Sequence, residues 1–315
     1  MKSQIPEKSV ANVDAVEACL AQQGYIATAD IAMAVYLAYH LGKPVLVEGP
    51  AGVGKTELAK SVAEGLEQAL IRLQCYEGLD ESKALYEWKY GKQLLYTQML
   101  KEKLADVLDG AEGLASSMQR LHQYSDVFYD REFLEPRPLL QALQNPDGAV
   151  LLIDEIDKAD YEFESLLLEI LSEFQVTVPE LGTVSAVAQP MVFLTSNSTR
   201  ELSDALKRRC IHLYIGYPSI DLEQRIVASR VPEIPQRLNE EMVSFVHAVR
   251  ELDLKKSPAV SETIDWARTL LLLNASKLDG ELVRSTLNLL LKFRDDIEQV
   301  ETELPGLLPA NREKT

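Results

Sequence analysis

The stretch that decides the fold covers residues 45–59 and reads VLVEGPAGVGKTELA. It opens with the apolar run Val45-Leu46-Val47, which predicts a short buried strand. A glycine-rich loop follows over residues 49–56. Beyond the loop, apolar residues recur every four positions, at Leu58, Val62 and Leu66. That recurrence is the spacing of one helix face, so the order strand, glycine loop, helix is predicted here.

The loop at residues 49–56 matches the phosphate-binding pattern G-x-x-x-x-G-K-[ST], with the strand before it and the helix after it that the mechanism requires. Its glycines let backbone N–H groups close around phosphates, and the helix N-terminus adds positive potential. Lys55 is placed to reach the terminal phosphates of a nucleotide, and Thr56 offers a hydroxyl to Mg²⁺. The alternative is a glycine turn that binds nothing, which the flanking strand and helix disfavour.

Two adjacent carboxylates, Asp154 and Glu155, follow the apolar strand predicted at residues 149–153. Ligands of open α/β sheets gather at the carboxyl ends of the strands, and two neighbouring carboxylates there repel each other unless a cation is close. We therefore expect Asp154 to support Mg²⁺ and Glu155 to polarise a water for attack on the γ-phosphate. The alternative, a solvated strand end, is weakened by the phosphate loop upstream.

Three further polar residues follow the later strands of the pattern. Asn197 ends the apolar run 191–195 and is placed to share the water with Glu155, although an Asn in such a turn is commonly a cap. Arg208 and Arg209 close a short helix that precedes the run 211–215. Their alternative reading is a basic helix end that complements the helix dipole.

The remaining pattern alternates strands with helices, which predicts a parallel sheet of five strands with helices on both faces. The five predicted strands are residues 45–47, 71–75, 149–153, 191–195 and 211–215. Residues 13–41 are predicted to be helical, 109–131 a loop, and 175–188 a hairpin.

From about residue 219 the pattern becomes helical throughout, so we expect an α/β domain over residues 1–218 and a small helical lid domain over 219–315. The last helix of the lid is predicted from apolar and threonine residues at helical spacing. They are Leu282, Thr286, Leu289, Phe293, Ile297 and Val300.

Composition narrows the function further. Among 315 residues, 49 acidic and 32 basic side chains give a net charge of −17. This charge disfavours nucleic acid and anionic lipid as partners, although a local basic channel is compatible with the net charge. The N-terminus has no apolar targeting core, and no apolar run is long enough for a membrane span, so a cytoplasmic location is expected. Three widely spaced cysteines fit neither a disulfide framework nor a zinc site.

Together these motifs look like an AAA+ ATPase, and four strings resemble the MoxR family. They are EGPAGVGKTELA at 48–59, LQCYEGLD at 73–80, IDEIDKAD at 153–160 and TSNSTRELSDAL at 195–206, and the resemblance covers about residues 24–273. It implies an AAA+ P-loop NTPase fold with a helical lid. It also implies that ATP and Mg²⁺ bind with the loop and the residue after it: Gly49, Pro50, Ala51, Gly52, Val53, Gly54, Lys55, Thr56 and Glu57.

The resemblance further implies a hexameric ring with ATP bound between subunits. Arg209 would then be the arginine that reaches the neighbour's γ-phosphate, with Arg208 as second choice. A helix-2 insert at about 76–98 and the hairpin at 175–188 would line the central pore. Many relatives carry a sensing arginine directly after a Ser-Pro pair, but here Ala259 stands in that place, and Arg268 is the nearest substitute.

By the same resemblance, the expected function is ATP-driven, chaperone-like maturation of a metal- or cofactor-dependent enzyme, together with a partner that carries a von Willebrand factor A domain. The segment at 73–80 and Tyr86-Glu87-Trp88 favour the branch that serves aerobic carbon monoxide dehydrogenase. Three alternatives stay open: a nucleic-acid motor, a GTPase or small-molecule kinase, and a nucleotide-gated scaffold without turnover. The GTPase is disfavoured because the chain lacks an Asn-Lys-x-Asp guanine-reading motif. The small-molecule kinase is disfavoured because the helical domain follows the sheet and is not inserted as a substrate lid.

Overall fold

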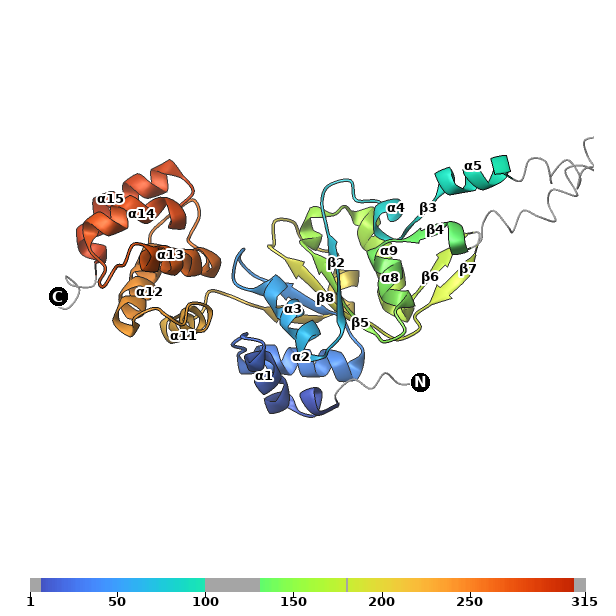
Figure 1. Cartoon of the computed structure of the whole chain (residues 1–315), viewed down its shortest axis with the longest axis horizontal. Coiled ribbons are helices and arrows are strands. Elements are labelled where there is room, and N and C mark those ends of the chain that lie inside the picture. The colour runs from blue at the N-terminus through green and yellow to red at the C-terminus, as the bar shows by residue number, and fades with distance from the viewer. Residues whose placement is uncertain (1–6, 100–130, 180, 309–315) are drawn as a thin grey trace, which may run out of the picture.

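The computed structural model describes residues 7–99, 131–179 and 181–308 (Figure 1). At its centre is a five-stranded sheet in the order β2-β5-β8-β1-β9, with all neighbours parallel. The strands are β1 (Val45–Glu48), β2 (Ala69–Gln74), β5 (Ala149–Asp154), β8 (Met191–Ser196) and β9 (Ile211–Tyr214). The predicted five-stranded parallel sheet is therefore confirmed. The carboxyl ends of β1, β8, β5 and β2 lie side by side, which brings the motifs to one edge.

Helices cover both faces of this sheet because side chains of a strand alternate between the two faces. Val45 and Val47 of β1 pack into one core with α1 (Val13–Gln22), α2 (Ala29–Leu41) and α3 (Lys55–Gly65). Leu46 packs into the other core with α8 (Pro138–Gln144), α9 (Tyr161–Glu173) and α10 (Asp204–Arg209). All six residues of β5 are buried, as expected for a strand covered on both faces.

The segment 13–41, predicted to be helical, consists of two helices separated by a turn. The first helix, α1, ends at Gln22, and Gly24 takes a left-handed conformation with φ 73°. Thr28 then caps α2, since its hydroxyl accepts a hydrogen bond from the Ile31 amide at 3.4 Å. The turn carries Tyr25 and Ile26 to the edge of the sheet, where they line the cavity described below.

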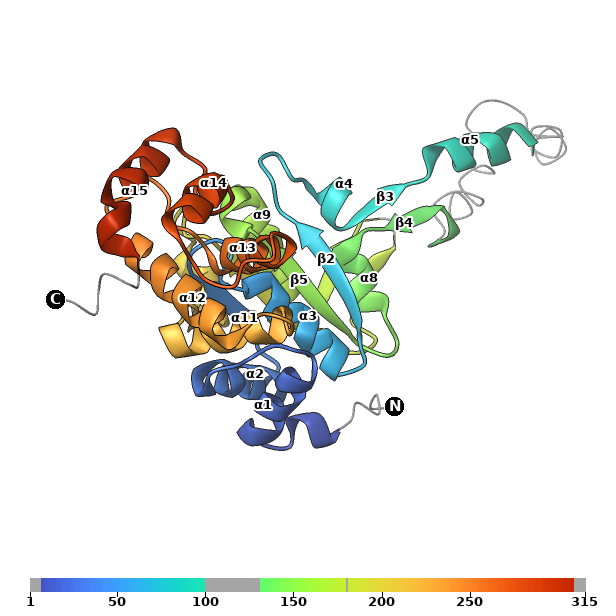
Figure 2. The ribbon, with the colours of Figure 1, turned by 60° about the vertical axis from the view of Figure 1, so that its left-hand side comes forward.

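Between β2 and α8 the chain builds a small arm. It contains α4 (Glu81–Ala84), β3 (Tyr86–Trp88), α5 (Tyr90–Met99), a 3-10 turn (Arg131–Phe133) and β4 (Leu134–Pro136). The short strands β3 and β4 pair antiparallel, and the sequence pattern did not predict β4. The helix α5 extends away from the sheet in both views (Figures 1 and 2). The loop predicted at 109–131 lies almost wholly outside the described residues.

Residues 175–188 contain two paired strands, β6 (Gln175–Val178) and β7 (Gly182–Ser185). Two further 3-10 turns complete the α/β part, at Glu7–Val10 and Ile156–Lys158. Within the part of the chain that the structure describes, no helix combines the length and the apolar character that a membrane span requires.

The C-terminal region is helical, as predicted, and lies beside the sheet edge (Figure 1). Its helices are α11 (Ile220–Arg230), α12 (Gln236–Arg250), α13 (Val260–Leu272), α14 (Gly280–Leu290) and α15 (Arg294–Leu307). Trp266 is fully buried at its centre and donates to the Thr286 hydroxyl at 2.8 Å. The single last helix predicted from 282 to 300 is two helices, because Phe293 is extended and 44% exposed.

A buried ion pair joins three helices of this region. Glu223 of α11 is fully buried and receives two hydrogen bonds from the Arg250 guanidinium of α12, at 2.5 and 2.8 Å. The Thr263 hydroxyl of α13 donates to the same carboxylate at 2.8 Å. A buried charge requires such partners, so this pairing fixes how the three helices meet.

Candidate functional site

The glycine loop lies between β1 and α3, as the sequence predicts. A Cβ at Gly49 would lie 2.0 Å from the Ile215 carbonyl oxygen, so any larger residue would push the loop away from β9. Gly52 takes φ 73°, and a Cβ there would meet Ala259 and Ser261 of the helical region at 2.5 and 2.6 Å. The helical region therefore packs directly on the phosphate loop.

Lys55 is the first residue of α3 and is buried. Its ammonium donates to the Gly49 and Pro50 carbonyls at 2.7 and 2.6 Å and to Asn197 Oδ1 at 2.8 Å. Burial lowers the pKa of Lys55, while nearby carboxylates, Asp157 first among them, oppose that shift. The ammonium is thus held between the loop and the end of β8.

Asp154 ends β5 beside this lysine and is 3% exposed. The Thr56 hydroxyl donates to its Oδ1 at 3.0 Å, and the Thr195 hydroxyl donates to the same oxygen at 2.5 Å. A threonine hydroxyl, a carboxylate and the phosphates of a nucleotide are the oxygen ligands that Mg²⁺ prefers. The donor set at Thr56 and Asp154 therefore fits Mg²⁺.

Glu155 follows in a left-handed conformation, with φ 58° and ψ 50°, which turns its side chain along the sheet edge. Its Oε2 accepts from Lys158 at 2.5 Å and from the Gln74 amide at 2.8 Å. Its Oε1 accepts from the Asn197 amide at 3.3 Å. Because that third contact is long, Oε1 is the oxygen best placed to take a proton from a water.

Asn197 links the two halves of the site. Its Oδ1 accepts from Lys55 and its amide donates to Glu155, so one side chain contacts both the cation and the general base expected from the sequence. Its backbone N–H donates to Asp157 Oδ2 at 3.2 Å. The structure therefore brings together Lys55, Thr56, Asp154, Glu155 and Asn197.

Two side chains of β2 also reach the carboxylates, and the sequence reading missed both. Arg72 Nη2 donates to Asp154 Oδ2 at 2.5 Å and to Gln74 Oε1 at 2.6 Å. Gln74 pairs in register with Asp154 across β2 and β5. The run Ile71-Arg72-Leu73-Gln74 alternates polar with apolar residues, which is the signal that puts Arg72 and Gln74 on one face.

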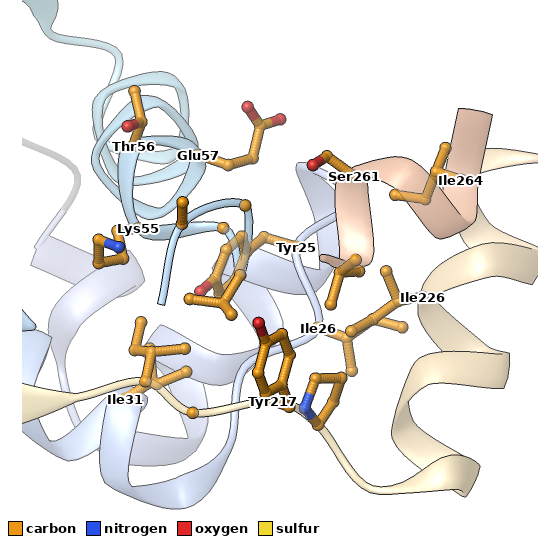
Figure 3. A pocket seen from close by; sticks show the side chains of 18 of the residues that line it. Tyr25, Ile26, Ile31, Lys55, Thr56, Glu57, Tyr217, Ile226, Ser261 and Ile264 are labelled. Atoms are coloured by element: carbon orange, nitrogen blue, oxygen red, sulfur yellow. The ribbon is translucent and has the colours of Figure 1, made fainter. Parts of the chain in front are cut away.

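A cavity of about 840 Å³ opens between this sheet edge and the helical region. The phosphate loop, Asp154 and Glu155 line it. Apolar and aromatic side chains line the rest of it (Figure 3). The labelled apolar and aromatic residues are Tyr25, Ile26, Ile31, Tyr217, Ile226 and Ile264. A phosphate loop together with apolar walls suits a nucleotide.

Tyr217 is held in the wall of this cavity by a residue that lies outside it. The Arg250 guanidinium stacks over its ring at 4.7 Å from the centroid and is itself bound to Glu223. Burial raises the pKa of Tyr217, so its hydroxyl stays protonated at neutral pH. No local sequence pattern signals this contact, because its members come from a linker and two helices.

The helical region brings two arginines to the cavity. Arg268 lines it, as the sequence reading allowed, but is exposed and pairs with Asp265 at 3.1 Å. Arg230 also lines it and pairs with Glu57 at 2.6 Å, directly after the loop. Glu57 therefore joins α3 to the helical region.

Arg208 and Arg209 lie elsewhere, at the exposed end of α10, and neither lines this cavity. Arg209 donates to the Ser172 hydroxyl of α9 at 2.8 Å and to the Ala205 carbonyl at 3.3 Å. The structure thus separates both arginines from the other predicted site residues of the same chain.

The cysteines take no part in the described site. Cys19, Cys75 and Cys210 are free thiols. Burial raises the pKa of Cys75 to about 12, so this thiol behaves as an apolar core residue at neutral pH.

Residues 96–210 match the family model of the AAA domain, dynein-related subfamily. An uncharacterised protein of Staphylococcus aureus strain NCTC 8325 / PS 47 is 25% identical over 271 residues, which cover 83% of this chain and 88% of that protein. An uncharacterised protein of S. aureus strain USA300 is equally similar, with 25% identity over 271 residues.

Among solved structures, the chain is similar to the RuvB Holliday junction branch migration motor of Thermotoga maritima. The identity is 18%, the match covers 90% of this chain and 74% of that chain, and the TM-score is 0.44. A mutant of the same RuvB gives 18% identity and a TM-score of 0.47, with 90% and 75% covered.

The matched residues 96–210 include β5 and β8 of the parallel sheet, and the phosphate loop before α3 lies at the same edge of that sheet. From these findings we conclude that the chain has the AAA+ P-loop NTPase fold, the fold of AAA+ ATPases.

Proposed function

We propose that this protein is a MoxR-type AAA+ ATPase that hydrolyses ATP with Mg²⁺ at the seams of a homo-oligomeric ring. Five residues that are joined by hydrogen bonds line one cavity, and this arrangement carries the proposal: Lys55, Thr56, Asp154, Glu155 and Asn197. Arg208 and Arg209 project from another surface. Because they lie outside this cavity, either arginine would reach a bound γ-phosphate only if a neighbouring protomer supplied it.

The mechanism assigns each residue a task that its contacts support. The loop N–H groups and Lys55 bind the phosphates, and Thr56 with Asp154 holds the metal. Bound Mg²⁺ supplies positive charge that neutralises the phosphate oxygens. Glu155 takes the proton of the attacking water while Asn197 orients it. An exposed arginine from the next protomer offsets the charge that develops on the transferred group.

The purpose of the cycle is proposed from the MoxR resemblance. We assign the protein to maturation of a metal- or cofactor-dependent enzyme, such as aerobic carbon monoxide dehydrogenase, together with a von Willebrand factor A domain partner. The projecting helix α5 supports contact with another polypeptide, since Tyr90, Leu94 and Leu95 are each more than half exposed on it. Apolar side chains exposed together on one element mark interaction sites more often than isolated ones do.

The division of labour at the site predicts two different losses. Lys55→Ala should abolish ATP binding, because the loop loses its cation, whereas Glu155→Gln should bind ATP and lose turnover by about 100-fold or more. Binding of a fluorescent ATP analogue and phosphate release measure the two steps separately. Equal loss of binding in both variants would contradict the assigned roles.

The Glu155→Gln variant, which should bind ATP without hydrolysing it, can also be used to identify the client. Glu155→Gln protein that holds ATP should retain its client and its partner during affinity purification, whereas Lys55→Ala protein should not. Recovery of a metalloenzyme and a von Willebrand factor A domain protein with Glu155→Gln alone is the expected result. Recovery of DNA that salt releases, with neither protein present, would favour the nucleic-acid motor instead.

A further inference from the structure

Arg72 lies at the metal end of the site, and the proposed reaction assigns it no task. It extends from β2, and its Nη2 reaches Asp154 Oδ2 at 2.5 Å. The Asp154 side chain is 4% exposed, whereas that of Arg72 is 48% exposed and lines the cavity. The pair therefore joins a buried carboxylate to a cation that has free space on its other side.

The two oxygens of Asp154 have different partners. Oδ1 accepts from the hydroxyls of Thr195 and Thr56 at 2.5 and 3.0 Å. Oδ2 accepts from Arg72 at 2.5 Å and from Thr56 only at 3.3 Å. Arg72 is thus the main partner of the second oxygen and supplies the positive charge that a buried carboxylate needs when no metal is bound.

A divalent cation bound to Asp154 would compensate the same negative charge. We propose that Arg72 is the counter-ion of Asp154 in the metal-free state and that the metal displaces it. Arg72 would then weaken metal binding and speed metal release after each cycle. The inference rests on the proposed function, because it takes Thr56 and Asp154 as the metal site.

The surroundings of Arg72 allow such an exchange. Its side chain comes from the outermost strand of the sheet, and within residues 7–99, 131–179 and 181–308 its ion pair is with Asp154 alone. Gln74 Oε1 accepts from the same Nη2 at 2.6 Å. Gln74 can therefore keep the displaced guanidinium near the site while the cavity receives the rest of the side chain.

The test is Mn²⁺ binding to protein saturated with ADP, measured from the electron paramagnetic resonance signal of free Mn²⁺. Arg72→Gln should tighten Mn²⁺ binding by about threefold to tenfold, the range expected for loss of a half-exposed pair to a buried carboxylate. Lys158→Gln is the matched control. Lys158 Nζ lies 2.5 Å from Glu155 and does not contact Asp154, so this variant removes an equal charge from the other carboxylate. It should change Mn²⁺ affinity by less than about twofold.

Arg72→Lys provides a second variant, since it keeps the charge, and its Mn²⁺ affinity should lie between those of wild type and Arg72→Gln. Unchanged or weaker Mn²⁺ binding in Arg72→Gln would overturn the inference. Equal tightening in Arg72→Gln and Lys158→Gln would also overturn it, because a general field effect would then suffice. If wild-type protein with bound ADP took up no Mn²⁺, the proposed function would fail instead.

Discussion

Asp157 is the residue on which the placement of Asn197 depends. Its Oδ2 accepts from the backbone N–H of Asn197 at 3.2 Å and from the backbone N–H and the hydroxyl of Thr199 at 3.0 and 2.6 Å. The side chain is 4% exposed. Burial by itself would raise the pKa of Asp157, but the bonds from Thr199 and Asn197 outweigh it, and the pKa lies below its usual value.

This lowered pKa predicts how stability depends on pH. A carboxyl group with a lower pKa in the folded state stabilises the fold above its unfolded pKa, and that stability is lost as the pH falls through the folded pKa. Asp157→Asn should lower the free energy of unfolding by about 1–2 kcal/mol at pH 7. The gap to wild type should shrink below about pH 4.

Urea unfolding from pH 7 to pH 3 measures this gap, with the exposed Asp253→Asn variant as control. A gap that stays constant over the whole range would show that the charge of Asp157 does not stabilise the fold.

At this scale, the sequence predicted the residues whose role follows from local order along the chain. Lys55 and Thr56 were found because they end the glycine loop that follows β1, and Asp154 and Glu155 because they stand at the end of the apolar strand β5. Arg72 was not predicted as a site residue, because its contact with Asp154 requires β2 to lie beside β5. The order of strands in a sheet cannot be predicted from local periodicity. The arrangement of Asp157 depends in the same way on β5 and β8 being neighbours.

At the scale of elements, two contacts join the helical region to the phosphate loop and to α3, across the cavity. Arg230 at the end of α11 pairs with Glu57 in the first turn of α3 at 2.6 Å. Ser261, in the first turn of α13, donates its N–H to the Gly52 carbonyl at 3.3 Å. Both contacts join the helical region to the phosphate loop or its helix, so they would hold the cavity closed around a nucleotide.

We expect Arg230 to matter more for nucleotide binding than Arg268 does. Arg230→Gln should weaken ADP binding by about threefold to fivefold, because it removes the half-buried ion pair with Glu57 across the cavity. Arg268→Gln should have a smaller effect, because that arginine pairs with Asp265 on its own helix. Titration with a fluorescent ADP analogue measures both variants.

The control is Arg237→Gln, which removes a 78% exposed arginine of α12. A larger loss of affinity in Arg268→Gln than in Arg230→Gln would instead make Arg268 the nucleotide-sensing arginine of the helical region.

Elements with strong periodicity were predictable, and short ones were not. The core strands stand out as continuous apolar runs because helices cover both of their faces. The strands β3 and β4 are three residues each and pair across more than forty residues of sequence, so no local pattern marks them. The break near Phe293 was missed because apolar spacing continues across that turn.

At the scale of the whole molecule, the proposed ring would bring Arg208 and Arg209 of one protomer to the site of its neighbour, because the two arginines lie outside the cavity of their own chain. Arg208 and Arg209 are both exposed, although the chain as a whole carries a net charge of −17. On so acidic a surface, two adjacent exposed arginines form a local basic site that suits a phosphate group. An arginine donated in this way is worth about 10³–10⁵ in rate in other nucleotide hydrolases.

The most direct measurement is therefore ATP turnover by mixed assemblies. Arg209→Ala protein and Lys55→Ala protein, each inactive alone, are co-expressed with different tags and purified through both tags, so that every assembly contains both chains. We predict that activity returns, because the Lys55→Ala protomer supplies Arg209 to a neighbour that still binds ATP. Doubly purified assemblies as inactive as their parents, or full turnover by Arg209→Ala alone, would contradict a site shared between protomers.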